Sequence, residues 1–385
     1  MSTRPGTATE AVEPRPGAGG PPTIADVARL AGVSRQTVSR VINGKGEITE
    51  ATRGRVQAVI DQIGFRPNAL ATSLAGGRSR TIGLIVTNPA SEIPTNPFFM
   101  SVIYGASVAA QEHGHGLTIK YMPAEAVVAR RHELFARGQV DGIVILRAHR
   151  SFADAFSVPE EHRPPVVLIG DFPDGSACPY LDIDNRSGCE QLAGHLLRHG
   201  LRRIATVCHS PAGHTTVDSR VRWFDEALRS AGVEVASVPP VWTDSTLADA
   251  HAKARALLEG PDRPDAVFAT NDWAAMAVLR AARDAGLRVP ADVAVVGFDD
   301  LPLAAYLEPP LTTVTFSGFD LGHEALTRML SQLELGTPIA SGHLPARLVV
   351  RMSCGCEDAV MADHDSEQIL DRHWGPPSLA PASAR

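Results

Sequence analysis

Short apolar runs alternate with helical stretches along most of the chain from Thr81 onward. The runs typical of buried strands are TIGLIV, LTIKYM, DGIVIL, VVLIG, RIATVC, AVFATN and VAVVGF. Between them, the segments 97–113, 187–199, 217–231 and 272–285 have helical spacing, and each ends near a glycine, where helices tend to stop. This alternation predicts an α/β fold of parallel βαβ units. The strands are too many for one small domain, so we expect two lobes.

The N-terminal part of the chain has helical spacing without strand-like runs. Thr23 is placed to cap a first helix, with Asp26 completing a capping box, before a glycine ends it. Ser34 is placed to cap a second helix, and Thr49 a third helix over about 50–63. Together they predict a minimal three-helix core, whose apolar positions are Ile24, Val27, Ala28, Ala31, Val38, Val41, Ile42, Val56, Val59, Ile60 and Ile63.

The second helix leaves polar side chains on its outer face. Arg35, Gln36 and Arg40 carry guanidinium and carboxamide groups, which match the edges of guanine and adenine in a major groove, so we expect them to contact bases. A hairpin buried in a larger core is the alternative, but it would not concentrate Arg, Gln, Ser and Thr on one face. Residues expected at the DNA phosphates are Thr23, Ser34, Thr37, Ser39, Asn43, Thr49, Thr52, Arg53 and Asn68. For Asn43, Thr49, Thr52 and Arg53, surface salt bridging is the alternative role.

Residues 67–80 link this helical head to the α/β body. Pro67 and Asn68 begin about seven helix-compatible residues, and two glycines follow. A helix of this length is too short to persist alone in water. Taken alone, the segment is compatible with a flexible linker whose leucine packs on the body.

These features together resemble the LacI/GalR family of LacI-type transcriptional regulators. The resemblance extends from Thr23 to about residue 356, and its landmarks are the DVA and GVS turn, TVSRVIN, the TR of the third helix, PNALATSL, NPFF, DIDN, TND and VVGFDD. It implies a helix-turn-helix head over 23–66 and a two-lobed, periplasmic-binding-protein-like body over 81–357. It also implies that 67–80 is a hinge helix and linker that orders on operator DNA, pairs with its dimer mate and inserts Leu74 into the minor groove.

By the same resemblance, the chain of the body crosses three times between its lobes. We place the crossings near Asp184, Thr313 and Gly336. The N-terminal lobe then comprises 81–183 and 314–336, and the C-terminal lobe comprises 184–312 and 337–357.

Polar and aromatic residues follow the predicted strands at their carboxyl ends, where ligands bind in open α/β sheets. Asn271, Asp272 and Trp273 come after AVFAT, and Asp299 and Asp300 come after VAVVGF. Arg, Asn and Asp side chains beside aromatic faces suit a polyol or sugar ring. The alternative for each residue is a structural role, such as capping the next helix or packing in the core. The predicted effector-binding residues are Phe98, Phe99, His214, Arg220, Asn271, Trp273 and Asp299.

The family resemblance bears on the same residues. The polar effector ligands and aromatic wall that it implies are Arg220, Asn271, Asp299, Phe98 and Phe99. Two departures weaken a purine effector, because Trp223 stands where the family more often has glycine and His214 where a purine-binding member would carry arginine. We therefore expect a sugar or sugar phosphate, with a nucleobase or nucleoside as the alternative.

The sequence contains no motif for catalysis or cofactor binding. It lacks G-x-G-x-x-G, G-x-x-x-x-G-K-[ST], G-x-S-x-G and H-E-x-x-H. Five scattered cysteines do not predict a secreted disulfide framework, and they fit the cytosol better. Cys354 and Cys356 form a C-G-C pair, but no second pair of the C-x-x-C kind accompanies it. We expect neither an enzyme nor a bound metal or cofactor.

Charge is divided unevenly along the chain, whose formal net charge is -7. Residues 23–80 hold nine Arg and Lys against four Asp and Glu, whereas the residues after 80 hold 25 against 37. A basic head and an acidic body favour DNA binding through the head, with strong salt dependence. The Pro-, Gly- and Ala-rich residues 1–22 are expected to be disordered. The flexible tail over 358–385 has no apolar heptad, so a homodimer must form through the body.

No apolar run approaches the roughly 20 residues that span a bilayer, and the N-terminus lacks the apolar core of a signal peptide. A cytoplasmic protein without membrane contact is therefore expected. The predicted function is a ligand-regulated repressor of carbohydrate-utilisation genes that binds a pseudo-palindromic, double-stranded operator as a dimer. A solute-binding module without gene control would need an export signal, and a sugar-processing enzyme would need a catalytic group.

Overall fold

The computed structural model of the 385-residue chain describes residues 22–42, 46–66, 79–87, 96–134, 139–156, 165–173, 175–233 and 239–356. The chain divides into two compact units, a head that ends at Ser79 and a body that begins at Arg80. Each unit has a hydrophobic core of its own.

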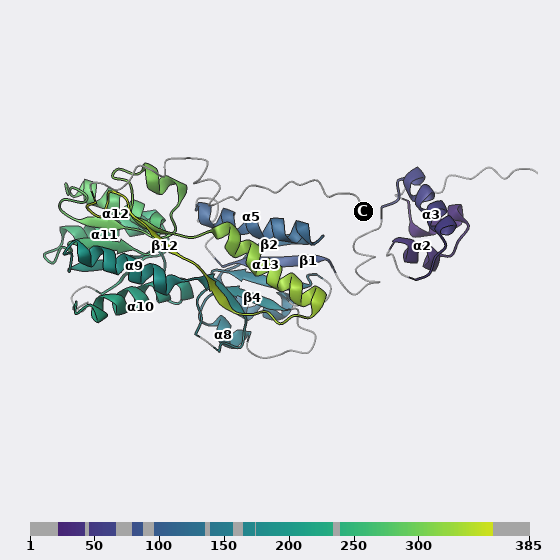
Figure 1. Cartoon of the computed structure of the whole chain (residues 1–385), viewed down its shortest axis with the longest axis horizontal. Coiled ribbons are helices and arrows are strands. Elements are labelled where there is room, and N and C mark those ends of the chain that lie inside the picture. Colours follow the sequence, from purple (N-terminus) through teal and green to yellow (C-terminus); the bar gives the residue numbers. More distant parts are fainter. Residues whose placement is uncertain are drawn as a thin grey trace, which may run out of the picture. The chain divides into compact units, whose positions relative to one another are not determined.

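The described part of the head consists of three helices, α1 (Ile24–Ala31), α2 (Arg35–Ile42) and α3 (Glu50–Ile63) (Figure 1). Thr23 caps α1 in the predicted capping box with Asp26. Val27, Val38 and Val56 are completely buried where the three helices meet. The helix-turn-helix fold predicted for this part of the chain is confirmed.

The N-terminal lobe of the body is built on a six-stranded parallel sheet with the strand order β11-β5-β4-β3-β1-β2. Its strands are β1 (Thr81–Val86), β2 (Gly116–Tyr121), β3 (Gly142–Leu146), β4 (Val166–Ile169), β5 (Tyr180–Ile183) and β11 (Gly342–Leu344). Its helices are α5 (Pro97–Glu112), α6 (Ala124–Ala129), α7 (Arg131–Leu134), α8 (Phe152–Ala155) and α13 (Gly318–Leu335).

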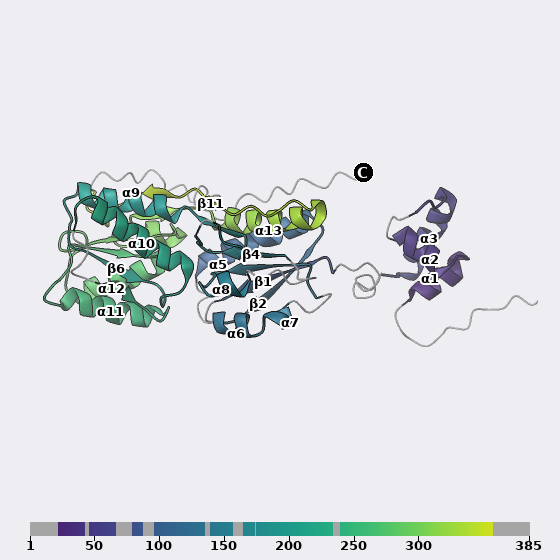
Figure 2. The same ribbon diagram turned by 90° about the horizontal axis from the view of Figure 1, so that it is seen from below.

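Both faces of this sheet are covered by helices, and Figure 2 shows α13 and α6 on opposite sides of it. Ile82 and Leu84 of β1 pack in the core formed with α5 and α13, whereas Ile85 packs in the core formed with α6, α7 and α8. Because both faces are buried, the strands are continuous apolar runs, which is why the sequence predicts them.

The C-terminal lobe has a four-stranded parallel sheet with the order β7-β6-β8-β9. Its strands are β6 (Ile204–Cys208), β7 (Val241–Trp242), β8 (Ala266–Ala269) and β9 (Ala294–Val296), and its helices are α9 (Asn185–Arg198), α10 (Thr215–Ser230), α11 (Leu247–Glu259), α12 (Asp272–Asp284) and the 3-10 helix η1 (Pro302–Tyr306). Helices α9 and α10 cover one face, and α11 and α12 cover the other (Figure 1).

The chain passes between the lobes after β5, after β10 (Thr313–Thr315) and after β11. On returning it forms β12 (Arg347–Val349), which pairs with β10 in an antiparallel ribbon. The predicted third crossing near Gly336 is too early, because β11 pairs with β5 in the sheet of the N-terminal lobe. This pairing satisfies backbone groups that an edge strand would leave open, so the N-terminal lobe extends to Leu344.

Two helices of the C-terminal lobe begin slightly before their predicted positions. Asp184 caps α9 by accepting a hydrogen bond from the Ser187 amide at 2.9 Å, and α10 starts directly after His214. Within the part of the chain that the structure describes, no helix combines the length and apolar character needed to cross a membrane.

Candidate DNA-binding face and ligand site

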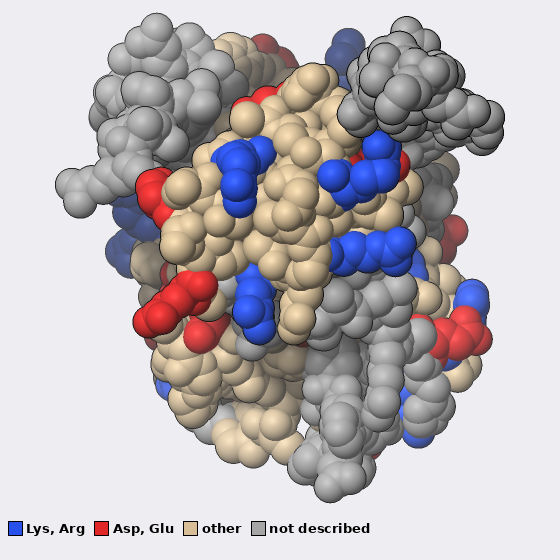
Figure 3. All heavy atoms as spheres, turned by 90° about the vertical axis from the view of Figure 1, so that its right-hand side faces the viewer, with Lys and Arg blue, Asp and Glu red and all other residues tan. Residues whose placement is uncertain are grey.

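The outer face of α2 exposes the three side chains predicted to contact bases. Arg35, Gln36 and Arg40 are exposed, whereas Val38 and Val41 of the same helix are buried. The residues of α2 with intermediate exposure are Thr37, Ser39 and Ile42. In Figure 3, Lys and Arg side chains are spread over the face that looks toward the viewer. An amphipathic helix with its polar side outward is what docking in a major groove requires.

Three residues predicted at phosphates are also the caps of the head helices. Each hydroxyl accepts a hydrogen bond from the amide three residues later, at 3.0 to 3.4 Å, in the pairs Thr23 with Asp26, Ser34 with Thr37 and Thr49 with Thr52. Arg53 Nε lies 3.9 Å from Glu50 Oε2, which agrees with the alternative role of Arg53 in a surface salt bridge. Helix N-termini carry partial positive charge, so they remain suited to a phosphate. Asn43, Asn68 and Leu74 lie outside the described residues, and their DNA contacts stay predictions.

A cavity of about 600 Å³, including the part open to solvent, lies between the two lobes of the body. The N-terminal lobe contributes side chains from the start of α5 and from the loop after β3, and the C-terminal lobe contributes side chains from α10 and from the ends of β8 and β9. The predicted effector residues that line it are Phe98, Phe99, His214, Arg220, Asn271 and Asp299. They meet because the carboxyl ends of the parallel strands in both lobes border the same crevice.

Trp273 is the one predicted effector residue that is not among those lining the cavity. Asn271 caps α12, its Oδ1 accepting a hydrogen bond from the Ala274 amide at 2.8 Å. The chain is therefore helical from Asp272 onward, and Trp273 lies half-buried on the helix instead of at the strand end. Asn271 thus fulfils its structural alternative as a cap while it also borders the cavity.

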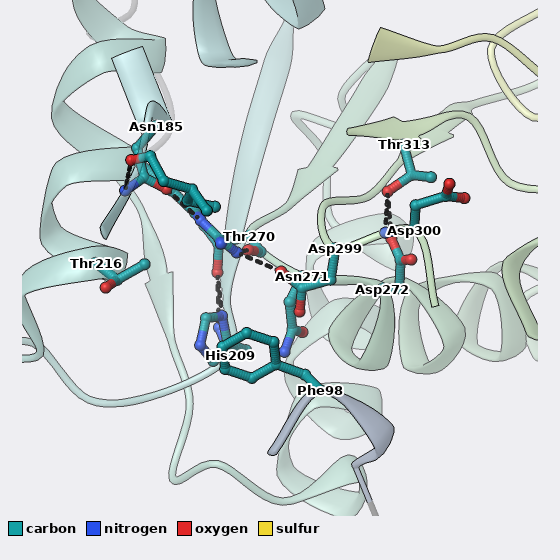
Figure 4. A network of polar contacts seen from close by, with 12 residues as sticks. Phe98, Asn185, His209, Thr216, Thr270, Asn271, Asp272, Asp299, Asp300 and Thr313 are labelled. Atoms are coloured by element: carbon teal, nitrogen blue, oxygen red, sulfur yellow. Dashed lines mark hydrogen bonds and ion pairs between the residues drawn. The ribbon is translucent and has the colours of Figure 1, made fainter. Parts of the chain in front are cut away.

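Arg220 is the centre of a buried polar network at the cavity wall. Its Nη1 atom donates to Asp299 Oδ1 at 3.0 Å and to the Thr270 carbonyl at 2.6 Å. Its Nε atom donates to Asn185 Oδ1 at 3.0 Å, and its guanidinium carbon lies 3.8 Å from the ring centroid of Phe298. Figure 4 shows Asn185, Thr270 and Asp299 converging on one point from separate elements. Only 3% of Arg220 is exposed to solvent. These contacts compensate for the cost of burying its charge.

Two buried carboxyl groups accompany this guanidinium. Burial raises the pKa of Asp299 to about 6, and the positive charge of Arg220 opposes the increase. Burial and the nearby carboxylate of Asp171 raise the pKa of Asp182 to about 6, while a 2.7 Å hydrogen bond from Thr216 Oγ1 opposes it. Both groups are mainly ionised at pH 7, so the wall of the cavity presents carboxylate oxygens that accept hydrogen bonds from hydroxyl groups.

His214 contributes an unpaired polar atom to the same wall. Its Nδ1 atom is buried and has no hydrogen-bond partner among the described residues. Burial, with a smaller effect from the charge of Arg147, lowers the pKa of His214 to about 3, so the imidazole is neutral at physiological pH. A buried polar atom without a partner is destabilising, and it offers a ligand hydroxyl a hydrogen-bonding position.

Several residues of this site are absent from the predicted set. Asp182 and Asn185 belong to the DIDN motif, which is a landmark of the family resemblance without a predicted role in the site. Asn185 Nδ2 donates to Asp182 Oδ2 at 3.3 Å. Arg147 and His209 line the cavity and follow β3 and β6. The same strand-end rule that selects Asn271 would have found both of them.

Comparison with known proteins places the chain among regulators. Residues 23–68 match the bacterial regulatory proteins of the lacI family, and residues 193–354 match the periplasmic binding protein-like domain. The HTH-type transcriptional regulator CelR of Thermobifida fusca is 36% identical over 312 residues, which cover 80% of this chain and 91% of that protein. A structure of the lac repressor dimer bound to operator and the anti-inducer ONPF has a TM-score of 0.76 at 27% identity and covers 87% of this chain and 99% of its own.

A structure of the transcriptional regulator CelR with cellobiose has a TM-score of 0.64 at 34% identity, with 86% of this chain and 99% of that chain covered. The chain therefore belongs to the lacI family of bacterial regulatory proteins. It is a DNA-binding transcriptional regulator with a helix-turn-helix head and a periplasmic-binding-protein-like body, and it is not an enzyme.

Proposed function

We propose that this regulator represses carbohydrate-utilisation genes as a homodimer, and that a sugar bound between its lobes sets its affinity for operator DNA. It acts in the cytoplasm, where it meets that DNA. The observation that carries the proposal is the interlobe cavity, in which aromatic rings of one lobe face Arg220 and Asp299 of the other. A ligand that contacts both lobes favours one arrangement of them over another.

The charges at the cavity favour a neutral polyhydroxyl ligand over a phosphate. Arg147 and Arg220 are matched by the carboxylates of Asp182 and Asp299, so the lining holds no excess of positive charge to balance a phosphate. A sugar offers hydroxyl groups to these carboxylates and apolar C–H faces to aromatic rings. The similar structure of CelR with cellobiose supports this ligand class.

On the DNA side, we propose that Arg35, Gln36 and Arg40 contact base edges and that Leu74 of the hinge enters the minor groove. The proposed phosphate contacts are those of Thr23, Ser34, Thr37, Ser39, Asn43, Thr49, Thr52, Arg53 and Asn68. A two-fold dimer places its two α2 helices in successive major grooves of a pseudo-palindromic site. The similar structure of the lac repressor dimer bound to operator supports this arrangement.

The DNA part is tested by selecting a preferred duplex from a random pool with the full-length chain. Affinities of Arg35→Ala and Gln36→Ala are then measured on that duplex and on random DNA. If the replaced residue contacts a base, the variant should bind the selected duplex about 1 to 3 kcal/mol more weakly. Its binding to random DNA should weaken by less. Arg29→Ala is the matched control, since Arg29 is an exposed arginine of α1 and lies outside α2. Equal losses on both duplexes would assign Arg35 and Gln36 to phosphates and contradict the proposed base contacts.

The ligand part is tested by thermal shift of the full-length chain against monosaccharides, disaccharides, sugar phosphates and nucleosides. A ligand present at 100 times its Kd stabilises the folded state by about 2.7 kcal/mol. We expect the shift from a neutral sugar, with a smaller shift from its phosphate. If nucleosides shift the melting temperature and none of the sugars does, the proposed ligand class is contradicted.

A further inference from the structure

Four metal-ligating side chains gather at one end of the C-terminal lobe, away from the interlobe cavity lining. His195 lies in the last turn of α9 and His199 directly follows that helix, so the two imidazoles are one helical turn apart on the same face. Cys354 and Cys356 come after β12, at the end of the described body. The ligand atoms of the four residues all lie within 4.8 Å of one another.

Three of the distances between these atoms lie near those of a tetrahedral coordination shell. Zn–S bonds of about 2.3 Å and Zn–N bonds of about 2.0 to 2.1 Å place neighbouring ligand atoms about 3.3 to 3.8 Å apart. His195 Nε2 lies 3.1 Å from Cys354 Sγ and 3.8 Å from Cys356 Sγ, and His199 Nε2 lies 3.2 Å from Cys356 Sγ. Small adjustments of these side chains would give every ligand a normal bond length to one central ion.

The backbone holds the two thiols on the same side of a tight turn. Gly355 between them has a φ of +102°, a conformation that a residue with a side chain rarely adopts. Ser353 fixes the turn against β9, its Oγ donating to the Val295 carbonyl at 2.6 Å and accepting from the Thr312 amide at 2.8 Å. Thr312 Oγ1 donates to Cys354 Sγ at 3.1 Å, which is the kind of contact that supports a thiolate ligand.

We propose that His195, His199, Cys354 and Cys356 bind a structural Zn²⁺ ion that fastens the end of the body to α9. Two thiolates and two imidazoles suit zinc, whereas Mg²⁺ and Ca²⁺ require oxygen ligands. Four protein ligands close the coordination sphere, so the ion has no open position for catalysis. His195 and Cys354 are buried while His199 is exposed and Cys356 partly exposed, which gives the ion access from solvent.

The sequence does not predict this site, because no C-x-x-C pair accompanies Cys354 and Cys356. The second ligand pair is the H-x-x-x-H spacing of α9, more than 150 residues earlier, as the separation of 159 between His195 and Cys354 shows. Only the packing of the residue 353–356 turn against α9 brings the pairs together. This proposal replaces the expectation from the sequence that the chain binds no metal.

The test uses full-length protein, purified with reductant and without a polyhistidine tag. We expect one Zn²⁺ per chain by elemental mass spectrometry. Replacement by Co²⁺ should give the visible bands of a tetrahedral ion together with thiolate charge-transfer absorption. Cys356→Ser and His199→Asn should each lower zinc affinity by about 100-fold or more in chelator competition, since changes outside the ligand shell alone cost about 10- to 100-fold.

His251→Asn is the matched control, because His251 is a partly exposed histidine of the same lobe that pairs with Asp284 at 2.9 Å outside the cluster. It should bind zinc like the unchanged protein. The two ligand variants alter the more exposed members of the cluster, and a circular dichroism spectrum like that of the unchanged protein would show that their bodies fold. Reduced protein that takes up no zinc, a cobalt spectrum without thiolate absorption, or unchanged affinity in both variants would overturn the proposal.

Discussion

Arg220 and Asp299 form an ion pair whose side chains are only 4% and 6% exposed, with Nη1 and Oδ1 3.0 Å apart. Asp299 also has a φ of +115°, which is strained for a residue other than glycine. Such strain persists where surrounding contacts hold the residue, here the ion pair and the hydrogen bond from the Asp299 amide to the Val314 carbonyl at 3.0 Å. Arg220 therefore has a structural role in addition to its position at the cavity, and truncating it changes more than ligand binding.

We predict that Arg220→Met lowers the free energy of unfolding of the body by about 3 to 5 kcal/mol, because it leaves buried carboxylates without their counter-charge. The double variant with Asp299→Asn should recover a large part of that loss. Urea unfolding followed by circular dichroism measures both values. In the control Arg255→Met, the half-exposed pair with Glu259 is removed and stability should hardly change. Equal losses in the single and double variants would show that charge pairing is not what Arg220 contributes.

The limits of sequence reasoning are visible at these same residues. Asn271 and Asp299 are predictable because each follows a strand-like apolar run, AVFAT or VAVVGF, and strand ends border ligand sites. Asn185 and Thr216 lie near helix starts, where capping is an equally good explanation. Only the tertiary fold brings Asn185 to Arg220 and Thr216 to Asp182. His195 and Cys354 are 159 residues apart, so no local pattern connects them.

At the scale of elements, the backbones of helices α5 and α13 in the N-terminal lobe pack close together at two glycines. A Cβ atom added at Gly105 would lie 2.0 Å from the Phe319 carbonyl oxygen, and one added at Gly322 would lie 1.9 Å from the Val102 carbonyl oxygen. Both distances are far below van der Waals contact, and the obstructing atoms belong to helix backbone. The two helices therefore depend on having glycine at each of these facing positions.

We predict that Gly322→Ala destabilises the N-terminal lobe by about 1 to 3 kcal/mol or more, since the helices must separate to admit the methyl group. Gly194→Ala in α9 is the control, because its nearest neighbour is the flexible end of Arg198 at 3.7 Å. That change should be neutral or stabilise by up to about 1 kcal/mol, through the higher helix propensity of alanine. Thermal unfolding of the unchanged protein and of the two variants measures these differences in stability. A Gly322→Ala protein as stable as the control would contradict the close packing.

Elements are predictable where local signals are strong, and length alone does not decide, since the 18-residue helix α13 is not among the predicted helices. Helix α3 is predicted with its observed bounds, since Thr49 caps its start and Gly64 ends it in the left-handed region. The short strands β7, β10, β11 and β12 contain only two or three residues each, too few for a periodic pattern. Strand β11 in particular is determined by its pairing with β5, and its omission displaced the third predicted crossing.

For the whole molecule, the proposed mechanism requires the ligand and the operator to act on one shared equilibrium. The cavity draws residues from both lobes, so a sugar that contacts Arg147 on one side and Asp299 on the other has different affinities for different lobe arrangements. If the operator also selects among these arrangements, thermodynamic linkage makes the effect reciprocal. The factor by which sugar changes operator affinity must then equal the factor by which operator changes sugar affinity.

We predict that this factor corresponds to about 1 to 3 kcal/mol, or roughly 5- to 150-fold, in either direction of measurement. Fluorescence anisotropy of a labelled operator with and without sugar gives one value, and calorimetric titration of sugar with and without operator gives the other. Arg147→Met, which changes a partly exposed cavity residue, should weaken sugar binding while operator affinity without sugar stays near normal. Arg150→Met, at an exposed arginine three residues away that is not among the lining residues, should leave both unchanged. Two unequal factors would mean that the sugar acts through a second site, because a single ligand linked to a single operator equilibrium cannot produce them.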